Sequence, residues 1–202
     1  MTFNLAEFIT AAHAAAKSDE PVRAVRHLME TVFADLPSLR AGLPDMPADS
    51  DDVIHFEDEY MTMYQSRFRA SIAMPPHDHQ MAAIIGLYAG SERNDFYRVA
   101  DANPNSNANS DANSDANSDA DANADADTFL TLSGGVSLTA GDVAGMGPNA
   151  IHTVTVTNGD TSEAIHIYLG SLSAAARHVF DLDNKQILPL TTENFQSLSK
   201  FS

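Results

Sequence analysis

Hydrophobic side chains recur every three or four residues along the first part of the chain, within residues 2–42. This spacing is typical of amphipathic helices. A polar break, Ser18-Asp-Glu-Pro21, divides the pattern, and Pro21 suits the first turn of a second helix. We therefore predict two helices that pack against the rest of the protein as a scaffold and contribute no catalytic residues. The hydrophobic positions are Phe3, Leu5, Phe8 and Ile9 before the break, and Val22, Val25, Leu28, Met29, Val32 and Phe33 after it.

From residue 53 onward the pattern changes to short runs rich in β-branched and aromatic residues, separated by turn residues. Such a succession is typical of an antiparallel sandwich or barrel. We predict an N-terminal helical segment with a Pro-containing link (1–52) packed on a barrel (53–190), followed by a C-terminal tail (191–202). The predicted strands are 53–57, 60–69, 80–88, 94–99, 129–132, 136–138, 151–157 and 163–169.

Residues 101–127 interrupt the strand pattern with a tract of Asp, Ala, Asn and Ser. Such a segment has almost no apolar area to bury, so burial cannot offset the entropy of ordering it. The tract also lacks the glycines of calcium-binding loops. We predict a disordered surface insertion without a catalytic role.

Composition narrows the functional classes further. The chain has 202 residues, no cysteine and a formal net charge of -17. The acidic surface disfavours nucleic-acid binding. No apolar stretch approaches the length of a membrane span, and the N-terminus has no pattern of a secretory signal, so we expect a cytoplasmic protein without membrane partners. The oligomeric state is left open. Without thiolates, any metal must be held by nitrogen and oxygen.

Two histidines separated by one residue, His77 and His79, lie just before an apolar run, and His152 opens a later β-rich run. Alternate residues of an extended chain point to the same side, so His77 and His79 would present two imidazoles together. A third imidazole from a distant strand would complete a metal site. The competing interpretation is a coincidence of surface or core histidines, and the ligand type does not choose between Fe, Zn, Ni and Cu.

Two stretches of the chain together resemble the motifs of the cysteine dioxygenase-like branch of the cupins. The first is Pro75-Pro-His-Asp-His79 with the following Glu92-Arg-Asn-Asp-Phe-Tyr-Arg98, and the second is Gly141-Asp142…Pro148…His152 with Glu163-Ala-Ile-His-Ile-Tyr-Leu-Gly170. The resemblance covers about residues 53–185. It implies a mainly β fold, a cupin double-stranded β-helix (jelly-roll barrel) with an N-terminal helical segment.

The resemblance also implies a mononuclear Fe(II) held by His77, His79 and His152. Most cupins add a glutamate four or five residues beyond the second histidine, whereas this chain has Ala82-Ala83-Ile84 there. That difference favours three neutral ligands over a two-histidine, one-carboxylate set.

His166 and Tyr168 match a pair beside the metal in this family, in which tyrosine donates to bound dioxygen or substrate and histidine orients it. The family's serine position is Ala164 here, so we expect the outer member of the relay to be missing. The pair could instead simply fill a β core.

A substrate carboxylate needs a cation, and the predicted anchors are Arg67 and Arg69, which share one face of a strand. They could equally form a solvated edge pair; Arg93 and Arg98 are weaker candidates.

These features together predict an iron-dependent dioxygenase that oxidises a small thiol, such as cysteine or 3-mercaptopropionate, to its sulfinate with dioxygen. Two alternatives remain. One is a metal-binding cupin that senses or binds a small molecule without turnover, and the other is a cupin enzyme with a non-thiol substrate, since cupins host many reactions.

Overall fold

The computed structural model describes residues 3–99 and 129–201; the predicted insertion 101–127 lies outside them. Three helices open the chain, α1 (Leu5–Ala16), α2 (Pro21–Phe33) and α3 (Leu36–Gly42). Asn4 caps α1 by accepting a hydrogen bond from the Glu7 backbone N–H, and Pro21 lies in the first turn of α2. The prediction of helices on either side of the polar break is confirmed.

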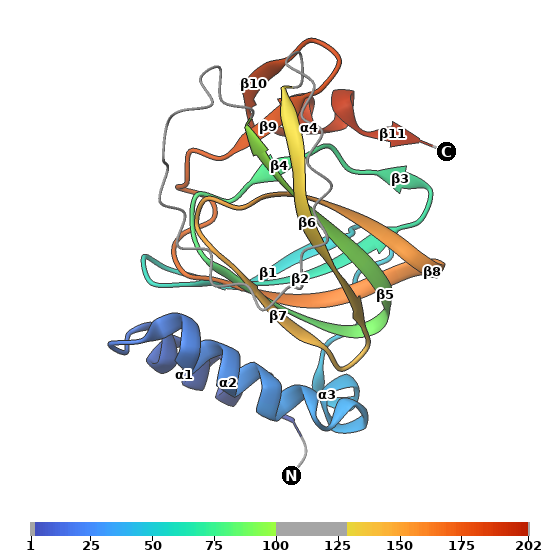
Figure 1. Ribbon diagram of the computed structural model, residues 1–202. Coiled ribbons are helices and arrows are strands. Elements are labelled where there is room, and N and C mark those ends of the chain that lie inside the picture. The colour runs from blue at the N-terminus through green and yellow to red at the C-terminus, as the bar shows by residue number, and fades with distance from the viewer. Residues whose placement is uncertain (1–2, 100–128, 202) are drawn as a thin grey trace.

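The remainder is mainly antiparallel β-structure that curls into a barrel (Figure 1). Its strands run in the order β1-β2-β8-β4-β9-β10, and β5 joins β8 to β6 and β7. This is the double-stranded β-helix fold expected from the sequence. The strands are β1 (Asp52–Glu57), β2 (Thr62–Arg69), β3 (Ile72–Ala73), β4 (His77–Asp78), β5 (Ala83–Val99), β6 (Leu130–Thr139), β7 (Val143–Met146), β8 (Ile151–Tyr168), β9 (His178–Asp181) and β10 (Gln186–Pro189).

Strands β5 and β8 are longer than predicted, because each joins two of the predicted strands. They pair with each other along most of their length, from Ala83↔Tyr168 to Tyr97↔Ile151, with register shifts between Leu87 and Glu92. At the bend, Gly90 has φ +74, and a Cβ there would lie 2.4 Å from the Thr161 carbonyl oxygen. Bulges and a glycine let one strand turn a barrel corner without ending.

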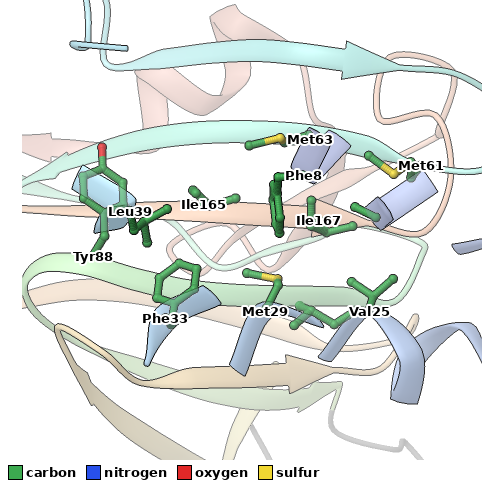
Figure 2. Close-up of a cluster of buried hydrophobic side chains, with 12 residues drawn as sticks. Phe8, Val25, Met29, Phe33, Leu39, Met61, Met63, Tyr88, Ile165 and Ile167 are labelled. Carbon is green, nitrogen blue, oxygen red and sulfur yellow. The ribbon is translucent and has the colours of Figure 1, made fainter. Parts of the chain in front are cut away.

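The three N-terminal helices lie beneath one face of the sheet, as Figure 1 shows. Their apolar sides and the outward-facing side chains of β2, β5 and β8 form the largest buried cluster (Figure 2). Its buried members are Phe8, Ala12, Val25, Met29, Phe33, Leu39, Met61, Met63, Ile84, Tyr88, Ile165 and Ile167. Burial of this much apolar surface is the main stabilising term for such a domain.

The C-terminal segment, predicted as a tail, forms a short helix, α4 (Thr192–Leu198), and a strand, β11 (Lys200–Phe201). Thr191 caps the helix by accepting from the Asn194 backbone N–H, and β11 pairs with β3. The segment therefore returns to the barrel. Among the described residues, no helix combines the length and apolar character that crossing a membrane requires.

Candidate metal centre

The three predicted ligands come together on the inner face of the barrel. His77 lies on β4 and pairs in register with His152 at the start of β8, while His79 follows β4. The ring centroids of these histidines are separated by 4.6 Å (His77 and His152), 5.2 Å (His77 and His79) and 4.9 Å (His79 and His152). All three side chains are buried.

The spacing of the nitrogens fits a shared cation. One ligand nitrogen from each of the three rings lies within 4.8 Å of the others, and His152 Nε2 is 3.3 Å from His79 Nε2. Two nitrogens that bind one ion at about 2.1 Å are separated by roughly 3.0–3.4 Å for bond angles near 90–109°. In the part of the chain that the structure describes, no carboxylate joins this group.

The electrostatic setting keeps the imidazoles neutral. Burial lowers the pKa of His77 to about 4. Burial, reinforced by the neighbouring histidines, holds the pKa of both His79 and His152 well below the ordinary value. Near neutral pH the rings therefore offer lone pairs rather than protons, as a divalent metal requires.

Hydrogen bonds orient two of the three rings. His77 Nδ1 lies 3.1 Å from the Pro75 carbonyl oxygen, which can only accept. His152 Nδ1 lies 3.0 Å from Asn94 Oδ1. When each Nδ1 carries the proton and donates it, each Nε2 is left unprotonated for a metal, the usual arrangement of histidine ligands.

A line of polar side chains runs beside the histidines from the end of β8. The Tyr168 ring lies 4.9 Å from the His79 ring, and Tyr168 Oη is 3.4 Å from His166 Nδ1. On the other side of that ring, His166 Nε2 is 2.9 Å from Ser66 Oγ. Burial raises the pKa of Tyr168 and lowers that of His166 to about 3, so both side chains are neutral.

Ser66 corrects one expectation. Ala164 occupies the position at which the motif that this chain resembles has serine, so the sequence predicts that one relay member is missing. In the structure Ser66 on β2 is the register partner of Ala164 on β8, and its hydroxyl contacts His166. A hydroxyl is therefore present beside the ring, but it comes from the neighbouring strand.

Aromatic side chains border these polar groups. Tyr64 on β2 packs edge-on against both His166 and Tyr168, at 5.6 and 6.1 Å between centroids. Phe195 of α4 packs edge-on against His77 at 5.7 Å. The C-terminal helix thus contributes a side chain to the site, which no spacing in the sequence indicated.

The structure does not bring Arg67 or Arg69 to the histidines. On β2, Ser66 faces inward to His166, so its neighbour Arg67, and Arg69 two residues on, face outward. Arg67 Nε donates to Glu163 Oε1 at 2.9 Å, and Arg69 makes a bidentate pair with Asp51 at 2.6 and 2.8 Å. Arg67 also lines a separate cavity of about 440 Å³ on this outer side. The two arginines predicted as carboxylate anchors therefore lie away from the three histidines.

Arg177 is a cation beside the site that the sequence analysis missed. It directly precedes β9, where His178 turns outward to donate its backbone N–H to Asp78 and to place Nδ1 3.0 Å from that carboxylate. Because side chains alternate along a strand, Arg177 and Val179 face the side opposite to His178. Val179 is the register partner of His77, so this is the side of the metal centre. Arg177 is half-buried. Its charge helps to lower the pKa of Glu57, but among the described residues its guanidinium makes no hydrogen bond or close ion pair. Its charge adds to the effect of burial in lowering the pKa of His77 and His79.

Comparisons with known proteins find no matching family model and no matching curated protein. Similar solved structures include an oxalate decarboxylase mutant from Bacillus subtilis (TM-score 0.37, 12% identity, covering 59% of this chain and 24% of that one). They also include a vicilin from Solanum melongena (0.40, 8%, 59% and 26%). An RmlC-like cupin family protein with a double-stranded β-helix fold from Methanocaldococcus jannaschii is similar too (0.38, 10%, 65% and 92%).

The chain spans about a quarter of the length of the oxalate decarboxylase and of the vicilin. These proteins are diverse, and their identities to this chain are low. The likeness therefore indicates no particular activity, and what the site can do has to be argued from its own residues.

Proposed function

We propose that the protein is an iron-dependent thiol dioxygenase that oxidises a small carboxylate-bearing thiol to its sulfinate. One observation carries the proposal: three buried, neutral histidines lie together with no carboxylate of the described residues among them, and Tyr168, in contact with His166, packs against His79. Bound Fe(II) would supply a site where a thiolate and dioxygen meet, and neutral ligands leave the ion the positive charge that attracts a thiolate.

The reaction balances without an outside reductant. The thiol R–SH and O₂ give R–SO₂H: the O–O and S–H bonds break, and sulfur forms two bonds to oxygen. Sulfur loses four electrons, dioxygen gains the same four, and the thiol proton passes to a sulfinate oxygen or to solvent. The protein therefore has to position two reactants and exclude water, which buried histidines and the aromatic rings of Tyr64 and Phe195 favour.

Tyr168 is the proposed hydrogen-bond donor to the reactants. If Ser66 donates to His166 Nε2, the ring proton lies on Nδ1 and is donated to Tyr168 Oη. The phenol proton is then directed away from His166, toward the three histidines. Because burial raises the pKa of Tyr168, this proton is retained near neutral pH.

Arg177 is the proposed carboxylate anchor. A guanidinium can bind a carboxylate through two parallel hydrogen bonds, which fixes orientation as well as position. By alternation Arg177 lies on the same side of the chain as Val179, the register partner of His77. Glu57, the carboxylate that feels its charge, already accepts hydrogen bonds from Ser171 and Ser173. A thiol held by its carboxylate there would direct its sulfur toward the histidines.

Oxygen uptake by Fe(II)-reconstituted protein tests the activity. We expect uptake and sulfinate formation with cysteine or 3-mercaptopropionate, and none with a non-thiol carboxylate. Protein that holds one iron per chain but consumes no oxygen with any thiol would instead favour a binding or sensing role, or a non-thiol substrate.

A substitution pair tests the anchor. Arg177→Gln should raise KM about 10- to 100-fold for 3-mercaptopropionate, and leave KM for cysteamine, which has no carboxylate, within about twofold. Arg67→Gln, which removes an outward-facing guanidinium, serves as the matched control and should change neither value. An equal effect of Arg177→Gln on both thiols would contradict the assignment.

A further inference from the structure

A buried carboxylate stands behind the metal-facing histidines, and the mechanism above does not use it. Glu92 on β5 is fully buried, with 0% of its surface exposed. Its Oε1 accepts from Asn94 Nδ2 at 3.0 Å, and its Oε2 lies 3.0 Å from the Ser162 hydroxyl. Within the described chain no cation pairs with it. A carboxyl group so costly to bury is retained where its hydrogen bonds matter.

The neighbours of Glu92 on its strand lead directly to the metal site. Glu92, Asn94 and Phe96 alternate toward the inner side of β5, whereas Arg93 and Asp95 pair with each other at the surface. Phe96 is the register partner of His152, and the two rings stack at 6.2 Å. Asn94 Oδ1 meets His152 Nδ1 at 3.0 Å.

The direction of these hydrogen bonds follows from Glu92. An asparagine amide has a donating and an accepting end, and either could face His152. Because the Glu92 oxygen accepts, the amide nitrogen of Asn94 turns to it, and the amide oxygen turns to the histidine. An oxygen there can only accept, so His152 must carry its proton on Nδ1 and leave Nε2 free.

We propose that Glu92 is a positioning residue that fixes the Asn94 amide, and through it the ring tautomer of His152, so that an unprotonated Nε2 faces the metal. The inference rests on the proposed metal site but not on the proposed oxidation of thiols. Without Glu92, Asn94 is free to rotate its amide and stabilise the tautomer that has a proton on Nε2. Partners of this kind typically change metal affinity 10- to 100-fold.

Zinc affinity, measured by competition with a chromophoric chelator, tests the proposal on folded variants. Glu92→Met, which keeps the length of the side chain and removes the acceptor, should weaken Zn²⁺ binding about 10- to 100-fold. Glu92→Gln, which keeps an accepting oxygen, should stay within about threefold of the original protein. Glu163→Gln, a matched change on the outward side of β8, should have no effect. Unchanged affinity in Glu92→Met would overturn the proposal.

A second measurement begins with the unmodified protein, and that part of it does not depend on whether Glu92→Met folds. Histidine ¹⁵N chemical shifts of the metal-free protein report which ring nitrogen is protonated. His152 should have its proton on Nδ1, and in Glu92→Met this preference should weaken. A proton on Nε2 of His152 in the unmodified protein would refute the inference. Neither readout depends on oxygen uptake, so a protein that oxidises no thiol can still pass or fail both.

Discussion

The two faces of strand β8 differ in almost every physical respect. Ile165 and Ile167 point outward and are completely buried against the helices. His166 and Tyr168 point inward, where they contact each other and polar groups of β2. Alternate residues of one strand thus serve two different purposes, and the sheet is the boundary between a stabilising core and a chemical site.

The comparison extends to energetics. The outer face gains stability because apolar area leaves water. The inner face buries imidazoles, a phenol and a carboxyl group. Each of them loses its hydration, and only hydrogen bonds within the protein offset the free-energy cost of that loss. Among the described residues, every buried side-chain nitrogen and oxygen has such a partner. We therefore expect substitutions on the two faces to affect different measurements.

The largest effect should follow from His79→Ala on the inner face. Removal of one of three ligands should abolish stoichiometric metal binding, as measured by elemental analysis of dialysed protein. The free energy of unfolding of the metal-free protein should change by no more than about 1 kcal/mol. Burial of this polar ring costs hydration, which is why its pKa is lowered, and its removal also removes that cost. The exposed His27→Ala is the control, and a full complement of metal in His79→Ala would remove this residue from the ligand set.

Ile167→Ala on the outer face should have the opposite effect: it should lower the stability of the protein and leave metal binding unchanged. The substitution leaves a cavity between β8 and the helices, and it should cost about 2–5 kcal/mol of stability in a urea titration. Bound metal per folded chain should not change. A loss below about 1 kcal/mol would show that the helices contribute less to stability than their packing implies.

Acidification should destabilise the metal-free protein through the inner face. Burial holds the pKa of His77 near 4 and that of His166 near 3, against 6.5 in an unfolded chain. Between these values the unfolded state binds more protons, so stability is full above pH 6.5 and declines as pH falls. Fully developed, these shifts correspond to about 3 kcal/mol for His77 and about 5 kcal/mol for His166. Urea midpoints at pH 7, 6 and 5 measure the decline, and equal midpoints would contradict the burial of neutral rings.

The smallest expected effect concerns Ser66. Ser66→Ala removes one hydrogen bond to His166, worth about 1 kcal/mol, and should slow thiol oxidation about fivefold with little change in KM. The double variant Ser66→Ala with Ala164→Ser returns a hydroxyl from the facing position and should recover most of the rate. If the double variant is as slow as the single one, the hydroxyl does not act through His166.

The sequence predicted those parts of the molecule that depend on local periodicity. Helical spacing located the N-terminal helices, and alternation placed His77 beside His79 and His166 beside Tyr168. The lengths of β5 and β8 could not be predicted in this way, because polar residues such as Asn158 and Asp160 at a barrel corner resemble a turn between strands. In the structure, contacts with neighbouring strand segments keep them in β8: Asn158 pairs with Ser91, and the Asp160 carbonyl accepts from the Ala70 backbone N–H.

The remaining site residues depend on which strands lie next to each other. Ser66 is meaningful only once β2 is aligned with β8, and Glu92 only once Asn94 faces His152. Whether Arg67 points into or out of the barrel depends on the register of β2, because a shift of one residue moves every side chain of the strand to the opposite face. Alternation along the chain predicts that Arg177 and His178 face opposite sides. That Arg177 is on the side of His77 follows only from the pairing of β4 with β9.

The register of Ser66 with Ala164 has a consequence for how such proteins diverge. Side chains at two register-paired positions of neighbouring strands lie close together on the same face of the sheet. Two single substitutions can therefore move a hydroxyl from one strand to the other and keep it near the same place. Descendants of such an exchange keep the geometry and lose the linear signature. Ancestry at this site is therefore better sought in pairs of facing positions than in the succession of residues along either strand.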